Sequence, residues 1–383
     1  MPSLVLVSYA SLFFLGLIDN IRGPFYPEIL ESFQLTSTRG SWFFAITSLF
    51  GFLGSWLSHR LVHRYSSLAL LQVSSVIFAL GFLAISQSST APMLWASCAI
   101  FGLAFGCLNL AQNSLVGEAA PLAHRRRVFA GLHSMYSLAA MAAPLVASGF
   151  RQLGWTWPSV FLTLAGLPVV GVVVVALKRI SSRSANQDRE PPRSLRPEEK
   201  RLLPLYALMM AGYLWGEISV TTRMVYWLRT DHGFTPDAAN FCMAGFCTLF
   251  LAGRVLFSLV SFHKWDNWRI LLVCAAGSSL FMLGGLAIHP FVMMLAGLTL
   301  APFFPVAMEQ ANVRFGAGAA QAMGSIIGFG SLSIVLMHLS VGFISDRASI
   351  STALYLCAGI LMLVSALLAI RVWSASRQVS VNV

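Results

Sequence analysis

Twelve apolar runs, most of them close to 20 residues long, occupy nearly all of this chain of 383 residues. A run of that length matches an α-helix that crosses a hydrocarbon core about 30 Å thick. The strands of a transmembrane barrel would instead alternate apolar and polar residues over segments of about ten, a pattern that the sequence lacks. The runs therefore predict an all-α membrane protein with twelve spanning helices.

Composition excludes a soluble fold. Hydrophobic residues make up 57% of the chain and charged residues only 10%, whereas a typical soluble domain carries about 25% charged residues. A soluble domain of this composition would not cover its surface with polar groups. We therefore interpret the chain as an integral, multi-pass membrane protein.

The spans fall into two sets of six, separated by the only long polar segment. The first set lies near 3–30, 36–58, 66–87, 92–117, 128–150 and 156–177, and the second near 203–228, 236–261, 268–288, 291–312, 319–343 and 351–373. Clustered charges and Pro191-Pro192 in the intervening segment favour a flexible linker. We predict an N-terminal six-helix bundle at 1–177, a basic cytoplasmic linker at 178–202 and a C-terminal six-helix bundle at 203–383.

The basic residues give the orientation. With the N-terminus in the cytoplasm, 18 of the 25 Lys and Arg residues fall in cytoplasmic segments and four in external ones. Cytoplasmic loops are enriched in Lys and Arg, so this bias favours both termini inside and localisation in the cell (inner) membrane. The first run lacks a basic start and a small-residue cleavage site, so we expect a retained helix rather than a signal peptide.

Other function classes find no support in the sequence. The net charge of +11 comes from loops between apolar runs, not from a soluble basic face, so we expect no nucleic-acid partner. The sequence contains no phosphate-binding loop, so we expect neither enzymatic activity nor a cofactor. We expect the protein to be a monomer. The cysteines lie within apolar runs without the paired spacing of a zinc site, so we expect no metal: Cys98, Cys107, Cys242, Cys247, Cys274 and Cys357.

The first span carries costly polar groups. Asp19, Asn20 and Arg22 lie where the pattern is still apolar, and Gly23-Pro24 follows at once. A charged side chain at the centre of a span costs at least about 2.5–3.5 kcal/mol, so such residues pair or line an aqueous path. Asp19 and Arg22 are three residues apart and share a helix face. An internal ion pair and a substrate contact both fit, and the breakers suit a helix that lines a cavity.

The seventh span, the counterpart of the first, carries Glu217 near its middle and Arg223 six residues on. Glu217 is a candidate for exchanging a proton during transport, with a structural hydrogen bond as the alternative. Two arginines facing one cavity, Arg22 and Arg223, would attract a carboxylate or a phosphate, because the guanidinium binds both groups bidentately.

Further candidates lie in the fourth and fifth spans. Asn109, Gln112 and Asn113 share one face of the fourth span, and amides suit hydroxyl-rich ligands as well as contacts between helices. His133 and Tyr136 share a face of the fifth span, where histidine is able to shuttle a proton.

Basic and acidic residues near the cytoplasmic ends of spans suggest an inward gate. Arg254 and the cluster Arg125-Arg126-Arg127 fit a gate or an anchor to anionic lipid. We assign to the gate Arg60, Arg64, Arg254 and Glu309.

Two six-span halves joined by a basic linker resemble the major facilitator superfamily over essentially the whole chain. The signature of that family after its second helix is roughly G-x-L-A-D-R-x-G-R-K, and the chain reads SWLSHRLVHR there. Leu57 and Arg60 match, whereas His59 replaces the aspartate and Val62 the glycine.

Other stretches resemble the sugar-porter subgroup that includes the fucose permease. FFLGLIDNIRGPFYPEI is similar to its first helix, CLNLAQNSLVG to its fourth, GLHSMYSLAAMAAPL to its fifth and LAPFFPVAMEQAN to its tenth. The coupling carboxylates of that subgroup in the first and fourth helices correspond here to Gly23 and Asn109, neither of which titrates. The resemblance therefore implies transport of a sugar-like solute, but any proton coupling rests on Asp19, Glu217 or His133.

We accordingly expect a secondary transporter that moves a small polar solute by alternating access, with protons as the coupling ion. The substrate side chains would be Asp19, Asn20, Arg22, Asn109, Gln112, Asn113, Tyr136, Glu217 and Arg223. Three alternatives stay open: an organic-anion transporter that uses Arg22 and Arg223, an exporter of amphipathic drugs or lipids, and a membrane sensor or scaffold without transport.

Overall fold

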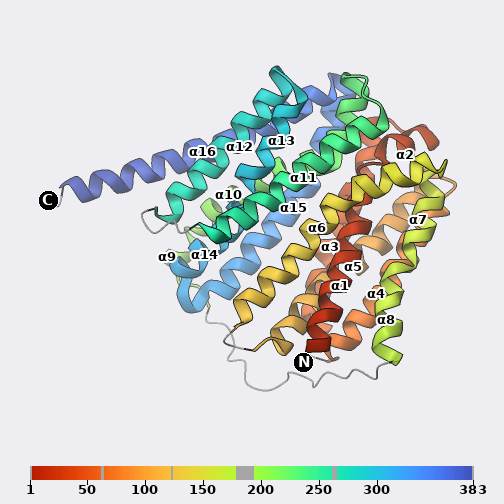
Figure 1. Cartoon of the computed structure of the whole chain (residues 1–383). Coiled ribbons are helices and arrows are strands. Elements are labelled where there is room, and N and C mark those ends of the chain that lie inside the picture. Colours follow the sequence, from red (N-terminus) through yellow and green to blue (C-terminus); the bar gives the residue numbers. More distant parts are fainter. Residues whose placement is uncertain (1, 62–63, 122–123, 178–193, 261–264, 382–383) are drawn as a thin grey trace. The chain divides into compact units, whose positions relative to one another are not determined.

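The computed structural model describes residues 2–61, 64–121, 124–177, 194–260 and 265–381. Within these ranges every regular element is a helix, as expected (Figure 1). Most of the linker, residues 178–193, and part of the signature segment, residues 62–63, lie outside the described residues.

The chain forms two compact units. Unit 1 comprises Met1–Arg189 with Phe234–Ala244, and unit 2 comprises Glu190–Gly233 with Gly245–Val383. The first residues of the eighth span thus group with unit 1, where Asn240 Nδ2 donates a 3.0 Å hydrogen bond to Ser148 Oγ. The bundle boundaries expected from the sequence stay a prediction.

Unit 1 contains eight helices that account for the first six predicted spans. They are α1 (Pro2–Ile21), α2 (Tyr26–Ser32), α3 (Ser37–Leu61), α4 (Ser67–Ser86), α5 (Ala91–Ala119), α6 (Arg125–Gln152), α7 (Trp157–Ala165) and α8 (Leu167–Leu177). The first predicted span, near 3–30, is divided at the helix breakers Gly23-Pro24: α1 ends at Ile21, and the Tyr26 N–H donates to the Gly23 carbonyl at 3.1 Å in a turn before α2.

Unit 2 is built from the remaining helices, except that α11 belongs to it only from Gly245 onward. They are α9 (Pro197–Lys200), α10 (Leu203–Asp231), α11 (Pro236–Leu259), α12 (Asn267–Ala287), α13 (Pro290–Leu300), α14 (Phe303–Phe315), α15 (Ala319–Arg347) and α16 (Ile350–Val381), with a short 3-10 turn at Gly316–Gly318. The tenth predicted span is broken at Ala301-Pro302 into α13 and α14, because the following proline disfavours a continuous helix.

Ten helices in the described ranges are long and apolar enough to cross a membrane. α10 is not among them, because Glu217 and Arg223 interrupt its apolar surface, and the sixth span, at Trp157–Val173, is a shorter apolar helix. With these two, the helices make up the predicted twelve-helix bundle. Buried serine hydroxyls inside spans donate to carbonyls of the preceding turn, as Ser8 does to Leu4 and Ser75 to Leu71, so these polar groups are satisfied within their own helix.

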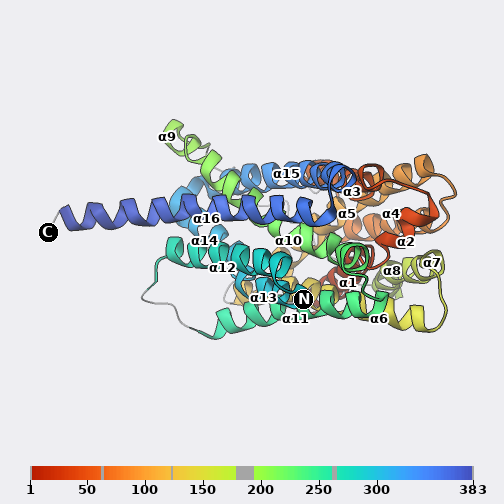
Figure 2. The same ribbon diagram turned by 90° about the horizontal axis from the view of Figure 1, so that it is seen from above.

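Glycines let the second and fourth spans of unit 1 approach each other closely. A Cβ at Gly102 on α5 would lie 2.4 Å from the Thr47 carbonyl oxygen on α3, and one at Gly54 would lie 2.1 Å from the Leu103 oxygen. Such distances are below any real Cβ contact, so only glycine fits. The two helices lie side by side in Figures 1 and 2.

The eighth and tenth spans of unit 2 repeat this crossing. A Cβ at Gly297 would lie 2.4 Å from the Phe246 carbonyl oxygen, and one at Gly253 would lie 2.4 Å from the Leu298 oxygen. Thr47 and Gly54 are seven residues apart, as are Phe246 and Gly253. The same register in both crossings supports the internal duplication that the sequence only hints at.

Candidate functional site

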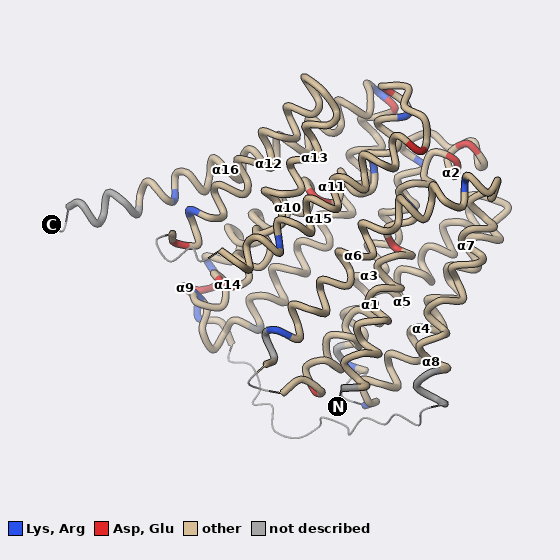
Figure 3. Tube along the Cα trace, viewed as in Figure 1, with Lys and Arg blue, Asp and Glu red and all other residues tan. Residues whose placement is uncertain are grey.

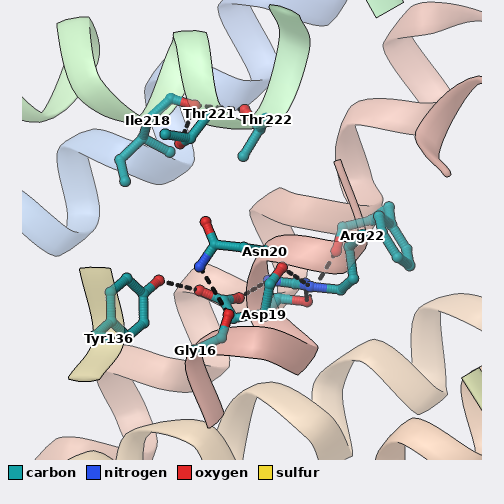
Figure 4. A network of polar contacts seen from close by, with 10 residues as sticks. Gly16, Asp19, Asn20, Arg22, Tyr136, Ile218, Thr221 and Thr222 are labelled. Carbon is teal, nitrogen blue, oxygen red and sulfur yellow. Dashed lines mark hydrogen bonds and ion pairs between the residues drawn. The ribbon is translucent and has the colours of Figure 1, made fainter. Parts of the chain in front are cut away.

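The polar groups of the first span form a network in unit 1 (Figure 4). Asp19 pairs with Arg22, and its other carboxylate oxygen, Oδ2, accepts a 2.6 Å hydrogen bond from the Tyr136 hydroxyl of α6. The Arg22 Nε–H also donates to the Asp19 carbonyl at 3.1 Å. Both oxygens of Asp19 are therefore engaged, and the network ties the end of α1 to α6.

Arg22 is enclosed by aromatic rings. Its guanidinium lies 4.8 Å from the centroid of the Phe101 ring, with Phe43 and Phe44 at 5.6 and 5.4 Å. Nη1 donates to Thr47 Oγ1 on α3 at 3.2 Å. Arg22 is only 5% exposed, so water solvates its guanidinium little. An acid, a hydroxyl and three aromatic rings stabilise the charge instead.

The local backbone explains how Asp19 and Arg22 meet. Three residues separate them, so α1 places them on one face. The helix ends at Ile21, and Arg22 opens the turn that precedes α2. From there its side chain returns along the final turn of α1 to Asp19 and also reaches Thr47 on α3.

A second network lies in unit 2 around Glu217. The Tyr213 side chain, one turn earlier on α10, lies within hydrogen-bonding reach of both Glu217 and Arg254 of α11. The Arg254 charge acts on the Glu217 carboxylate, and its guanidinium also lies 4.6 Å from the centre of the Phe250 ring. Tyr213 is held by the Phe303 ring at the start of α14, stacked at 5.1 Å with an angle of 5°.

The two networks have the same chemical content. Each places a carboxylate of the first span of its half beside a tyrosine hydroxyl and an arginine. In unit 1 the tyrosine comes from another helix and the arginine from the same segment, whereas in unit 2 the reverse holds. In each network the carboxylate thus lies beside a hydrogen-bond donor and a cation, which lower the cost of placing it within a span.

Arg223 lies one and a half turns beyond Glu217 and is 1% exposed. Its charge acts on Cys357 of α16, so α10 presents it to its neighbours within unit 2. Glu217 itself is half-buried. The sequence grouped Arg223 with the substrate residues, and its side chain is buried within unit 2.

The predicted amide cluster divides into two environments. Gln112 is fully buried, and its Nε2 donates a 2.7 Å hydrogen bond to Ser11 Oγ on α1. Asn109 and Asn113 are half-buried and contact each other, with Asn113 Nδ2 3.2 Å from Asn109 Oδ1. Asn20 is also half-buried and donates to the Gly16 carbonyl at 2.8 Å. Asn20, Asn109 and Asn113 thus keep polar atoms accessible.

The other predicted residues lie apart from these networks. His133 is exposed on α6, one turn before Tyr136. The expected gate residues Arg60, Arg64 and Glu309 are exposed as well, and the Arg60 guanidinium stacks 4.0 Å over the Trp56 ring. Arg254 instead belongs to the network around Glu217.

Two participants were missed by reasoning from the sequence. Thr47 is one of many hydroxyl residues in spans and carries no signal. The second is Tyr213, whose proximity to Glu217 was predictable from the sequence, because residues four apart on a helix are neighbours.

In the described residues no group of three or more His, Cys, Asp or Glu side chains is placed to hold a metal, and the six cysteines are buried and free.

Comparison with known proteins identifies the family to which this fold belongs. The sequence model of the Major Facilitator Superfamily matches residues 9–331. The chain belongs to this superfamily. The Major Facilitator Superfamily fold accounts for the two six-span halves and for the repeated helix crossing, and it identifies the chain as a multi-pass membrane protein of a transporter family.

Individual relatives of this superfamily member are distant. "Bypass of stop codon protein 6" of Saccharomyces cerevisiae is 24% identical over 359 residues, which cover 81% of this chain and 71% of that protein. A bacterial homologue of the human lysosomal transporter Spinster, in an inward-facing unoccupied conformation, matches with a TM-score of 0.76, 12% identity and 95% of both chains. A D-xylose–proton symporter matches with a TM-score of 0.75, 13% identity and 96% of both chains. These structures share the fold.

Proposed function

We propose that this protein is a secondary transporter that moves a small polar, sugar-like solute by alternating access, coupled to protons. One observation carries the proposal: the first span of each half holds a carboxylate beside a tyrosine hydroxyl and an arginine. Ionisable groups within spans face the protein interior and mark solute or proton pathways. We place the protein in the cell (inner) membrane, as a monomer with both termini in the cytoplasm.

Glu217 is the proposed coupling residue. It is half-buried in the span, and Tyr213 and Arg254 provide alternative partners for its two protonation states. When Glu217 is ionised, Arg254 neutralises it. When Glu217 gains a proton, Arg254 is released to its other contacts, and the carboxyl becomes a hydrogen-bond donor for a solute hydroxyl.

The proposed solute contacts are the accessible polar atoms of the list derived from the sequence. Asn20, Asn109 and Asn113 are half-buried and carry amides that both donate and accept, as a ligand rich in hydroxyl groups requires. That a protein of the same fold is a D-xylose–proton symporter agrees with this substrate class. Asp19 would act by positioning the Tyr136 hydroxyl and by fixing Arg22 at the C-terminal end of α1.

The organic-anion alternative needs accessible arginines. Arg22 is 5% exposed and lies within an aromatic enclosure, and Arg223 is 1% exposed. An anion would have to displace Asp19 from Arg22 and open the packing around Arg223. Burial therefore disfavours this alternative, and we keep it as an outcome of the experiment below.

Purified protein in proteoliposomes tests the proposal. An inward proton gradient should drive accumulation of a labelled pentose or hexose. Glu217→Gln should abolish accumulation while exchange of labelled for unlabelled sugar persists, because the solute contacts remain. Glu31→Gln, which alters an exposed carboxylate of α2, is the matched control and should accumulate like the parent protein.

Two results would contradict the proposal. Full gradient-driven accumulation by Glu217→Gln would remove Glu217 from coupling. Uptake of labelled carboxylates or phosphate esters, without sugar uptake and with loss in Arg22→Ala, would favour the organic-anion transporter.

A further inference from the structure

An aromatic cluster closes one end of unit 2, where α10 begins. Tyr206 is 3% exposed, and its ring meets the Trp268 ring of α12 edge-on at 5.8 Å and the Phe315 ring of α14 at 5.2 Å. Its hydroxyl lies near the Gln310 side chain without a well-formed hydrogen bond. The cluster therefore offers a rigid surface with a polar atom at its edge.

Two arginines rest on this cluster. The Arg371 guanidinium, from α16, lies 5.5 Å from the centre of the Trp268 ring. Arg314 precedes Phe315 at the end of α14, and the charges of both arginines act on the Tyr206 hydroxyl. Both arginines are exposed. Four helices thus bring two cations to one polar edge.

No carboxylate neutralises these cations in the part of the chain that the structure describes. Asp266, the acid closest in sequence to Trp268, already has a partner, because Arg269 Nε lies 3.7 Å from Asp266 Oδ2. The Asp266 side chain also accepts from the Arg269 N–H at 2.8 Å as the cap of α12. Among the described residues, the guanidinium groups of Arg314 and Arg371 thus have no acidic partner.

The cluster lies where the apolar sequence of α16 gives way to polar sequence. The last apolar residues of that run are Val372 and Trp373, and the polar stretch SASRQ follows from Ser374. Trp373 and Trp265 are exposed by 57% and 48%, as expected for tryptophans at the interface between membrane and water. α16 extends beyond its neighbours in unit 2, and basic residues lie on it and at the start of α12 (Figures 2 and 3).

We propose that Arg314 and Arg371 bind the phosphate of an anionic phospholipid at this end of unit 2. Guanidinium groups bind phosphate oxygens bidentately, and the Trp268 ring fixes the plane of Arg371. The acyl chains would lie along the apolar surfaces of α12 and α16, where Val273 and Ile370 are exposed. The loop charges assign this end to the cytoplasm, whose leaflet carries anionic lipid.

The test measures lipid retention by native mass spectrometry of the detergent-purified full chain. Phosphatidylglycerol should remain bound at a defined stoichiometry, whereas phosphatidylcholine, which carries no net charge, should be retained far less. The double variant Arg314→Gln/Arg371→Gln should weaken phosphatidylglycerol binding roughly 30-fold, from about a factor of five for each cation near the headgroups. Both side chains are exposed, so folding should not depend on them.

Arg347→Gln is the matched control. Arg347 is also exposed, at the end of α15, with its guanidinium 4.7 Å from the Phe343 ring, and the loop charges assign it to the external side. Its removal should leave retention unchanged. Equal loss in this control, or undiminished retention in the double variant, would overturn the proposal.

A second measurement separates lipid from free anion. Phosphatidylglycerol should raise the melting temperature of the parent protein and not that of the double variant. Inorganic phosphate should not do so at the same concentration, because it lacks acyl chains to bury. Equal stabilisation by phosphate would replace the lipid with a free-anion ligand, and Trp268→Leu, which removes the platform under Arg371, should lower lipid retention on its own.

Discussion

The Tyr136 hydroxyl donates a 2.6 Å hydrogen bond to Asp19 Oδ2 across 117 residues of sequence. This bond joins α6 to the end of α1, and the other oxygen of Asp19 pairs with Arg22. The carboxylate thus has two partners of different chemistry. Loss of either one should change the stability and the transport activity of the protein in a distinguishable way.

Tyr136→Phe should lower the free energy of unfolding by about 1.5–3 kcal/mol, because a hydrogen bond to a charged group is lost while Arg22 still holds Asp19. Tyr9→Phe is the matched control. The Tyr9 hydroxyl also joins α1 to α6, through a 2.6 Å bond to the neutral Val128 carbonyl, so its loss should cost only about 0.5–1.5 kcal/mol. Thermal unfolding in detergent checks both, and equal costs would argue against an ionised Asp19.

Asp19 and Arg22 should behave as a coupled pair. Asp19→Asn or Arg22→Gln alone should destabilise the protein by about 3–5 kcal/mol, because each leaves a buried charge without its counter-ion. The double variant should cost clearly less than the sum of the two. A double-mutant cycle measures this coupling, and strictly additive costs would mean that the pair contributes nothing as a pair.

The repeated helix crossing makes Gly102 and Gly297 equivalent. Alanine at either position should destabilise the protein by about 1–3 kcal/mol or more, because the added Cβ would meet a backbone oxygen at 2.4 Å that cannot turn aside. Gly149→Ala in α6 is the control, since nothing lies within 4 Å of its Cβ, and should be neutral or stabilising by up to about 1 kcal/mol. Similar melting temperatures for all three variants would show that the helices do not approach as closely at Gly102 and Gly297 as described.

The amides of α5 should separate into structural and solute-binding residues. Gln112→Leu should lower stability through the loss of its 2.7 Å bond to Ser11 but retain most sugar uptake, because Gln112 is fully buried. Asn113→Leu should instead reduce uptake at least tenfold with a smaller effect on stability, because Asn113 is half-buried. Uptake and thermal unfolding of both variants test this division, and the reverse pattern would exchange the two roles.

Local spacing allowed much of the fold to be predicted. The lengths of the apolar runs predicted twelve spans, and the spacing of three placed Asp19 and Arg22 on one helix face, because a helix relates residues three or four apart without reference to the rest of the chain. That the two form an ion pair was left open by the sequence. The same spacing would have paired Tyr213 with Glu217. Composition and motif order also indicated the family, since both reflect the membrane environment and shared ancestry rather than any single contact.

Tertiary structure alone decided which distant partners complete each network. Thr47 and Tyr136 reach the first span from α3 and α6, and Arg254 reaches Tyr213 from α11. Packing also buried Arg223 and Gln112 while leaving His133 exposed, although all three looked alike as polar residues in spans. The physical reason is that helix rotation and crossing register, fixed here by glycine contacts such as Gly102 with Thr47, determine which side of a span faces a neighbour.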